Sequence, residues 1–371
     1  MKPKLVFSIA VILIAAFVLG ACATGPRVSS VAGLSASDSA AYVSFGQYVV
    51  KIDTAKEEST KDFAWQYPQK GSTNVIFHAA PLIDGDKIVV GDFANVLHGL
   101  KDADGSETWS FSGAKGWYQS AVVKDGNTYY VANFDRNLYA INAADQSIKW
   151  VFSDSFGFLA SPLIVDSKLI IASQNHKVIA LDKESGKVLW EAQTKGSLAC
   201  APYYDASSKM LIAGDIGNEL VWINLESGKV SQTFNDSGSM AAIWSSPVKS
   251  GEHIVVTDDK GVIYLMTPEG KLAQKIASVG PMLAGALPVE GGFVTVTSDG
   301  TVRFIKNGDS KATWTQTIKG VKDAPVALNT TPVLSGKTIV IAGLTNNHTT
   351  LMVWGYDFAG NLLWSYPSEK K

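Results

Sequence analysis

The sequence predicts an all-β fold, an eight-bladed β-propeller of four-stranded antiparallel blades. Three observations lead to this prediction. A tryptophan or glutamine recurs every 40 to 50 residues, a small residue or leucine followed by proline recurs in phase with it, and short β-branched runs fill the intervals. No helical period occurs beyond the N-terminal region. Self-similarity at this period is typical of propellers, whose blades are four-stranded sheets.

The first landmark closes a short strand at the end of each repeat unit. It is tryptophan in six units and glutamine in two, at Trp65, Trp109, Trp150, Trp190, Gln232, Gln274, Trp314 and Trp364. The spacings of 44, 41, 40, 42, 42, 40 and 50 residues define eight units. We interpret these residues as structural. Each tryptophan ring is expected to pack between adjacent blades, with its indole N–H bonded to a neighbouring backbone carbonyl.

The second landmark is a residue–proline pair that precedes the first landmark by 26 to 32 residues. The pairs are Ala80-Pro81, Ser161-Pro162, Ala201-Pro202, Ser246-Pro247, Leu287-Pro288 and Thr331-Pro332. Proline fits the first residue of a strand, where its missing N–H is not needed. The first unit has no such pair, and its first strand must come from residues 30–37. We therefore expect blade one to be the least regular blade.

The fourth unit shows the expected strands most clearly. Apolar, β-branched runs occupy residues 162–165, 168–173, 177–182 and 187–190, and turn-forming residues separate them. Glycines such as Gly105, Gly186, Gly228 and Gly270 supply the left-handed turn before the last strand. A single blade cannot cover its own apolar faces, so neighbouring blades stack and the ring closes.

The N-terminus predicts export and lipid anchoring. Lys2 and Lys4 precede an apolar run over residues 5–21, which is shorter than the ~20 residues of a membrane-spanning helix. The run ends in Leu19-Gly20-Ala21-Cys22, which resembles the bacterial lipoprotein signal. That resemblance implies removal of residues 1–21 and acylation of Cys22. Residues 22–37 then form a tether and the start of blade one, and residues 38–371 form the propeller. An ordinary secretory signal and a retained single-span anchor remain the alternatives.

Composition excludes several classes of function. Without residues 1–21 the chain has 30 basic and 34 acidic side chains and no block of five like charges, so we expect no nucleic-acid partner. Cys200 is the only other cysteine, and we interpret it as a small buried strand residue. The five histidines show no paired metal-ligand spacing, and the acids lie mostly in turns. The sequence therefore predicts no metal, no cofactor and no catalytic residue.

Residues Ala180 to Trp190, Ala-Leu-Asp-Lys-Glu-Ser-Gly-Lys-Val-Leu-Trp, resemble the repeat of pyrroloquinoline-quinone-type propellers. Two groups share that repeat. The quinone-dependent dehydrogenases use a Ca²⁺ ion, a catalytic Asp and often a vicinal Cys-Cys pair, and this sequence has no Cys-Cys. The second group is the BamB family of lipoproteins, which combine a lipid signal with eight such blades and no catalytic apparatus. The segment from Gly214 to Gly228 also resembles a blade of that family.

The resemblance implies a non-enzymatic scaffold of the bacterial cell envelope. It would be a monomer within a larger complex, anchored by its lipid, with the outer-membrane β-barrel assembly machinery as partner. In a host with one membrane, the location would be the outer face of the cytoplasmic membrane. The alternatives are another extracytoplasmic adaptor or ligand-binding propeller, and a quinone-dependent dehydrogenase. Aromatic connections at 116–119, 154–158 and 242–244 are open to two interpretations, inter-blade packing or ligand contact.

Overall fold

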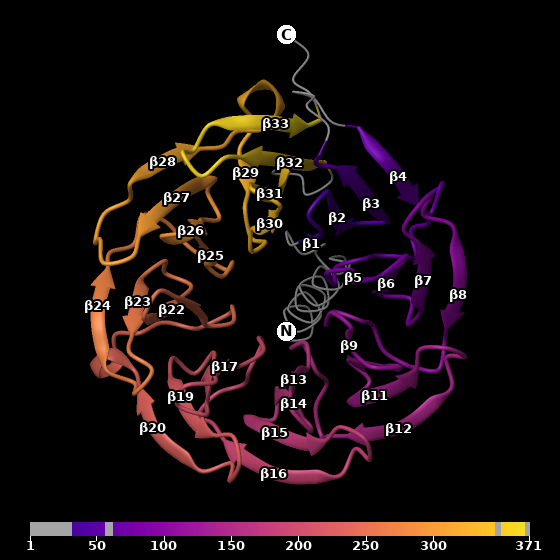
Figure 1. The fold of residues 1–371 in the computed structure, drawn as a ribbon, viewed down its shortest axis with the longest axis horizontal. Helices are drawn as coiled ribbons and strands as arrows, with labels where there is room; N and C mark the ends of the chain where they lie inside the picture. The colour runs from indigo at the N-terminus through magenta and orange to yellow at the C-terminus, as the bar shows by residue number, and fades with distance from the viewer. Residues whose placement is uncertain (1–31, 56–61, 346–349, 368–371) are drawn as a thin grey trace, which may run out of the picture.

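The computed structural model describes residues 32–55, 62–345 and 350–367. Eight antiparallel sheets stand around a central axis, as Figure 1 shows, which confirms the predicted eight-bladed propeller. The chain fills the ring in sequence order, with the first strand of each blade nearest the centre and the last at the rim. Cys22 and the predicted signal lie outside the described residues.

The first four blades each have four strands. Blade one contains β1 (Gly33–Ala36), β2 (Ala40–Phe45), β3 (Tyr48–Asp53) and β4 (Phe63–Tyr67). Blade two contains β5 (Leu82–Asp84), β6 (Lys87–Gly91), β7 (Leu97–Lys101) and β8 (Glu107–Phe111). Blade three contains β9 (Val123–Asp125), β10 (Thr128–Ala132), β11 (Asn137–Asn142) and β12 (Ile148–Ser153). Blade four contains β13 (Leu163–Val165), β14 (Lys168–Ser173), β15 (Lys177–Asp182) and β16 (Val188–Gln193).

The second half of the ring continues in the same order. Blade five contains β17 (Tyr203–Asp205), β18 (Met210–Gly214), β19 (Leu220–Asn224) and β20 (Val230–Phe234), followed by the 3₁₀ turn η1 (Asp236–Gly238). Blade six contains β21 (Val248–Ser250), β22 (His253–Thr257), β23 (Ile263–Met266) and β24 (Leu272–Ile276). Blade seven contains β25 (Leu287–Val289), β26 (Gly292–Val296), β27 (Thr301–Lys306) and β28 (Trp314–Thr317). Blade eight contains η2 (Val321–Asp323), β29 (Val326–Ala327), β30 (Val333–Ser335), β31 (Thr338–Thr345), β32 (Leu351–Tyr356) and β33 (Leu362–Tyr366).

Blade eight, rather than blade one, is the irregular blade. Blade one is a plain four-stranded sheet, whereas β29 and β30 both pair with β31 and make blade eight five-stranded. The expectation that blade one would be least regular is therefore wrong. The 50-residue spacing between Trp314 and Trp364 accommodates the extra strand. β1 needs no proline, because Gly33 to Ala36 pair with β2 in an ordinary register.

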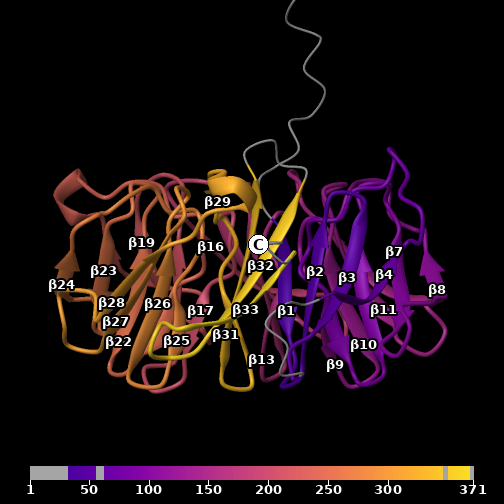
Figure 2. The same cartoon turned by 90° about the horizontal axis from the view of Figure 1, so that it is seen from above.

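The ring has two different faces, which Figure 2 shows edge-on as the top and bottom of a disc. Antiparallel order places the blade-to-blade connections and the second-to-third turns on one face, here called the loop face. The hairpins between first and second strands, and between third and fourth strands, lie on the opposite turn face. Residues 112–121 and 154–161 belong to the loop face, and residues 85–86 and 102–106 belong to the turn face.

The ring closes by packing between the first and last blades. The Thr330 hydroxyl donates to the backbone oxygen of Ala32 at 2.8 Å and accepts from its N–H at 3.1 Å. The Ser335 hydroxyl donates to the backbone oxygen of Ser37 at 2.7 Å. A buried cluster from β1–β3 and β31–β33 fills the space beside these bonds. Closure therefore uses the same apolar packing that joins the other blades, supplemented by hydroxyl contacts near the axis.

All eight landmark residues lie on the outermost strand of their blade. Four of the tryptophans donate their indole N–H to a backbone oxygen in the next blade. The bonds are Trp65 to Asp102 at 2.7 Å, Trp150 to Lys183 at 3.1 Å, Trp190 to Leu225 at 2.9 Å and Trp314 to Phe358 at 3.0 Å. The predicted role is confirmed for these four residues.

Trp109 departs from that role. Its buried indole N–H has no acceptor among the described residues, and its ring lies against Gly99 in its own blade. The ring of Trp364 lies in the same way against Gly355. In both blades the glycine is the direct cross-strand partner of the tryptophan. The expected bond to the next blade is therefore wrong for Trp109, because the space above Gly99 accepts the ring instead.

In blade five the tryptophan lies on the third strand instead of the fourth. Trp222 on β19 lies opposite Gln232, is fully buried, and donates its indole N–H to the backbone oxygen of Pro268 in blade six at 3.1 Å. The Gln232 amide donates to the backbone oxygen of Gly270 in the same turn. At this interface the indole ring therefore comes from Trp222, the cross-strand neighbour of Gln232.

Candidate functional site

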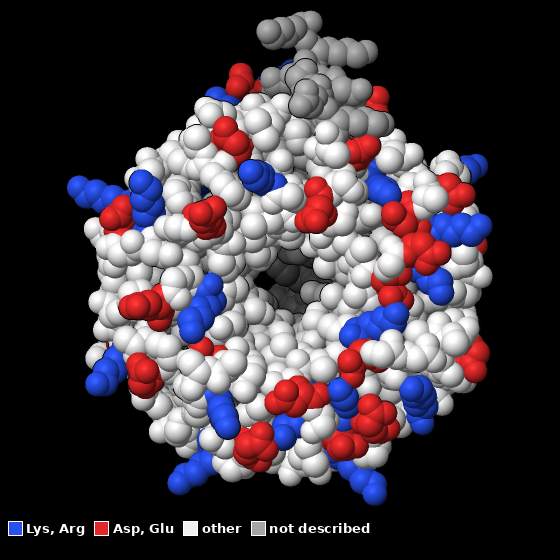
Figure 3. Space-filling model, viewed as in Figure 1, with Lys and Arg blue, Asp and Glu red and all other residues white. Residues whose placement is uncertain are grey.

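A channel, visible as a central hollow on the face shown in Figure 3, lies on the axis of the ring, and Figure 1 places the first strands of the blades around that axis. Residues at the predicted residue–proline starts reach its wall, namely Ala80, Ser161, Ser246 and Thr331. The described lining contains no Asp, Glu, Lys or Arg. The channel is therefore a neutral site.

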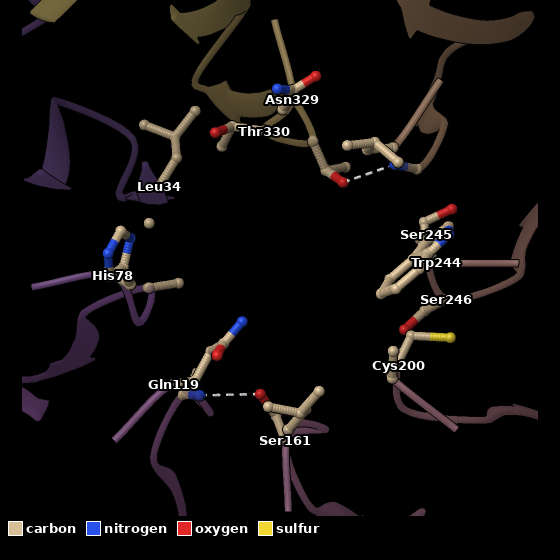
Figure 4. A pocket seen from close by; sticks show the side chains of 18 of the residues that line it. Leu34, His78, Gln119, Ser161, Cys200, Trp244, Ser245, Ser246, Asn329 and Thr330 are labelled. Carbon is tan, nitrogen blue, oxygen red and sulfur yellow. Dashed lines mark hydrogen bonds between the residues drawn. The ribbon is translucent and has the colours of Figure 1, made fainter. Parts of the chain in front are cut away.

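A cavity of about 630 Å³ occupies the channel toward the loop face. Figure 4 shows side chains converging on it, among them Leu34, His78, Gln119, Cys200, Trp244 and Asn329, and its lining comes from all eight blades. Cys200 is 8% exposed, and burial raises the pKa of its thiol to about 12. Such a thiol stays protonated at neutral pH and is a poor nucleophile. Its interpretation as a buried residue is confirmed, although it lies just before β17 rather than within it.

The aromatic connections fall into two kinds. Trp117 stacks on Phe134 with ring centroids 4.1 Å apart and on Phe93 at 5.8 Å, although the side chain is 38% exposed. These two ring contacts give Trp117 a role in packing between blades. Trp244 has no ring stacked on it within the described part of the chain, and it is 43% exposed at the cavity wall. Of these two tryptophans, Trp244 has the ring that is free for a ligand.

Exposed apolar side chains gather on the loop face and on the rim. The connections carry Trp117, Phe156, Trp244, Val279 and Leu283, all at least 38% exposed. The outermost strands carry Ile148, Val151, Val188, Leu189, Leu272, Leu362 and Leu363. Acids and bases are instead interspersed over the face shown in Figure 3, with no large area of one sign. Exposed apolar residues of this kind are typical of surfaces that contact other proteins.

A buried polar cluster links blades one and two. His98 on β7 contacts Asp92 through Nε2 at 3.2 Å and Glu107 through Nδ1 at 2.9 Å. The Tyr67 hydroxyl from β4 lies 3.1 Å from the same Nδ1. Burial alone would lower the pKa of His98, but the bonds to the two carboxylates outweigh it and raise the pKa above its usual value. Sequence reasoning missed this cluster, because its members come from three strands and a turn with unrelated spacing.

The channel does not fit the quinone cofactor found in one branch of this repeat type. That cofactor requires a Ca²⁺ ion held by hard oxygen ligands, and carboxylates are the usual donors. The cavity wall offers hydroxyls, amides and methyl groups instead. Among the described residues, no three His, Cys, Asp or Glu side chains come together in a way that could bind a metal. The donor set of the channel wall therefore does not match a quinone–calcium pair.

Of the predicted site residues, the eight landmarks lie at the rim, far from the channel lining. Cys22, the predicted lipidation residue, lies outside the described residues, and its acylation stays a prediction. In the described ranges, no helix has the length and apolar character needed to span a membrane.

The strand order and the repeat define a class, the propellers built from pyrroloquinoline-quinone-type repeats. Within that class, the chain belongs to the family described as outer membrane protein assembly factor BamB. The family's sequence profile matches residues 49–196, 94–235 and 232–371. These three stretches overlap and together cover residues 49–371, from β3 of blade one through blade eight. A comparison with curated proteins finds no match.

Solved structures agree on the fold. The crystal structure of BamB from Moraxella catarrhalis superposes with a TM-score of 0.69 at 12% identity, over 90% of this chain and 97% of that one. The computationally designed Ika8 protein superposes equally well, with a TM-score of 0.70 at 11% identity, over 88% of this chain and 96% of that one. A designed ring and a natural one match the chain alike, so these two likenesses describe architecture and not activity.

Proposed function

We propose that this chain is a lipid-anchored, extracytoplasmic scaffold that assists the assembly of outer-membrane β-barrel proteins through protein contacts. The observation that carries the proposal is membership of the BamB family over residues 49–371, in a chain that begins with a lipoprotein-type signal. The neutral channel, which does not fit the quinone, supports a scaffold over a dehydrogenase. The exposed apolar side chains of the loop face supply a surface suited to a protein partner.

Site-specific photocrosslinking in membranes of the native host tests the partner. A photoreactive residue at Phe156, which is 54% exposed on the loop face, should capture the barrel-inserting protein of the assembly machinery. The matched control is Glu184, exposed in a hairpin of the turn face, where we expect no such product. Capture of a transporter or a polysaccharide-assembly protein from the loop face instead would favour a different envelope adaptor.

Anchoring is tested separately through Cys22→Ser. Acylation at Cys22 attaches more than one chain, and several chains hold a protein at a membrane far more firmly than one. The variant should appear as a soluble protein or accumulate as an uncleaved precursor. If it is processed and sediments with membranes like the parent chain, Cys22 is not the anchor.

A further inference from the structure

The mouth of the channel has an open aromatic wall on one side. The Trp244 ring projects into the cavity from the connection between β20 and β21, as Figure 4 shows. Unlike Trp117, which stacks on Phe93 and Phe134, it has no ring stacked on it within the described residues and is 43% exposed. An exposed indole at the wall of a cavity offers a flat apolar surface to a ligand with a flat apolar face.

The other walls offer hydrogen bonds that the fold leaves free. Gln119 is exposed to the cavity, and its side-chain amide has no partner in the described structure. The Ser161 hydroxyl accepts from the backbone N–H of Ala121 at 2.9 Å, and the Thr331 hydroxyl accepts from that of Gly285 at 2.8 Å. Each hydroxyl can still donate its own hydrogen toward the channel. Donors and acceptors thus line the same cavity as the indole.

The wall is also without fixed charge. His78 and the buried Cys200 are the titratable side chains of the described lining. An ionised ligand would lose its hydration here without gaining a counter-charge, which is costly. Small residues in the lining leave the cavity wide, among them Ala80, Ala121, Ala199 and Gly285. The cavity of about 630 Å³ lies within the range of small-ligand sites, ~300–1,000 Å³.

We propose that the channel mouth binds a neutral saccharide, either a short oligosaccharide or the end of a neutral glycan. One face of a pyranose ring carries C–H groups that would pack on Trp244. Its hydroxyls both donate and accept, as do the Gln119 amide and the hydroxyls of Ser161 and Thr331. The inference does not rest on the assembly role, because it uses the channel wall rather than the exposed loops.

Titration of the purified full-length chain with defined sugars tests the inference. The probes are the trimers of glucose (α-1,4 and β-1,4 linked) and of N-acetylglucosamine, with the trimer of galacturonic acid as the charged comparison. We expect saturable calorimetric binding of at least one neutral trimer in the range of about 0.1–1 mM, with quenched tryptophan fluorescence. The acidic trimer should bind at least tenfold more weakly.

Variants then assign the site. Trp244→Ala should weaken binding of the neutral trimer at least tenfold, and Gln119→Ala severalfold. Trp244→Phe should retain part of the affinity, because it keeps an aromatic wall. The matched control is Trp117→Phe, at a ring that stacks on Phe93 and Phe134 and is not part of the cavity lining, where binding should not change. Melting temperatures close to the parent's would show that the Trp244 variants still fold.

Four outcomes would overturn the inference. The first three are no binding of any neutral trimer up to about 50 mM, equal binding of the acidic trimer, and binding that survives Trp244→Ala. The fourth is binding of unfolded peptides but not sugars at Trp244. Loss of sugar binding in Trp244→Ala should leave crosslinking from Phe156 intact, so failure of this proposal and failure of the scaffold role are distinguishable.

Discussion

The interface between blades four and five and the interface between blades two and three contain the same landmark tryptophan but place its ring differently. Trp190 crosses to blade five, bonds to the backbone oxygen of Leu225 and covers Gly228. The Trp109 ring lies on Gly99 of its own blade and stacks on Tyr129 of blade three, with its buried N–H unpaired within the described residues. Identical residues at identical strand positions thus seal two interfaces by different contacts.

Two other positions account for the difference. The residue opposite Trp190 is Ala180, whose methyl group occupies the space that Gly99 leaves open for Trp109. On the receiving side, blade five offers Gly228 with a φ of 66°, whereas blade three has Gln146 in the corresponding turn. Gln146 carries a side chain where blade five has a glycine, and its amide donates to the backbone oxygen of Ala143 in the same turn at 3.2 Å. A landmark tryptophan therefore crosses to the next blade under two conditions. Its cross-strand partner is not glycine, and the turn between the third and fourth strands of the next blade contains a glycine.

The largest expected loss of stability comes from removing an indole ring. Comparing tryptophan with glutamine at the landmark position shows whether the ring or the position matters. Trp222→Ala should cost roughly 3–5 kcal/mol of unfolding free energy, the range for emptying a buried aromatic site, because this residue is fully buried. Trp190→Ala should cost somewhat less, because its ring is only partly buried. Gln232→Ala should cost only about 1 kcal/mol, the worth of one hydrogen bond. Denaturant titration measures all three, and equal losses at Gln232 and Trp190 would contradict the assignment.

The next effect tests the receiving turn. A Cβ at Gly228 would lie 2.6 Å from the Trp190 ring, at a φ of 66°. Gly228→Ala should therefore cost about 3 kcal/mol, from left-handed strain together with overpacking. Gly85 is the matched control, because its φ is 63° but nothing lies within 4 Å of a Cβ there. Gly85→Ala should cost only the strain, about 1 kcal/mol. Similar losses at the two sites would show that the ring contact contributes nothing.

A subtler pair of substitutions should act in opposite directions. Trp190→Phe removes a 2.9 Å hydrogen bond and should destabilise by about 1–2 kcal/mol. Trp109→Phe removes a buried N–H that has no acceptor within the described structure, so it should be neutral or stabilise by up to about 1 kcal/mol. The two variants lose the same atoms, which isolates the hydrogen bond. Destabilisation of both by the same amount would mean that Trp109 is bonded in solution.

Most of the fold was predictable from the sequence, since landmarks at a fixed spacing give the blade count and place Trp190 or Gln232 on outer strands. Which blade each landmark tryptophan packs on was not predictable from the sequence, because it depends on cross-strand and inter-blade neighbours such as Gly99 and Gln146. The extra strand of blade eight, β29, was not predictable, because no landmark residue marks it within the 50-residue spacing between Trp314 and Trp364. For the channel, the residue–proline pairs that reach its wall are visible in the sequence, and none of them contains an acid or a base. That Trp117 has a stacked ring and Trp244 has none depends on Phe134, which belongs to a different turn.

Blade two also differs from blade four on its other side, and this difference should give the smallest effect, one that depends on pH. Where blade four packs Ile179 against blade three, blade two places His98 against Tyr67 of blade one, bonded to Asp92 and Glu107. The pKa of His98 is raised in the folded chain, so the protonated form stabilises folding. This contribution is full below the unfolded pKa of ~6.5 and is lost as pH rises through the folded value. Unfolding free energy should therefore fall with rising pH above ~6.5, and His98→Gln should flatten that slope while Ile179→Val leaves it unchanged. A parent chain and a His98→Gln variant with the same pH dependence, measured by denaturant titration from about pH 6 to about pH 9, would show that the histidine is not charged in this interface.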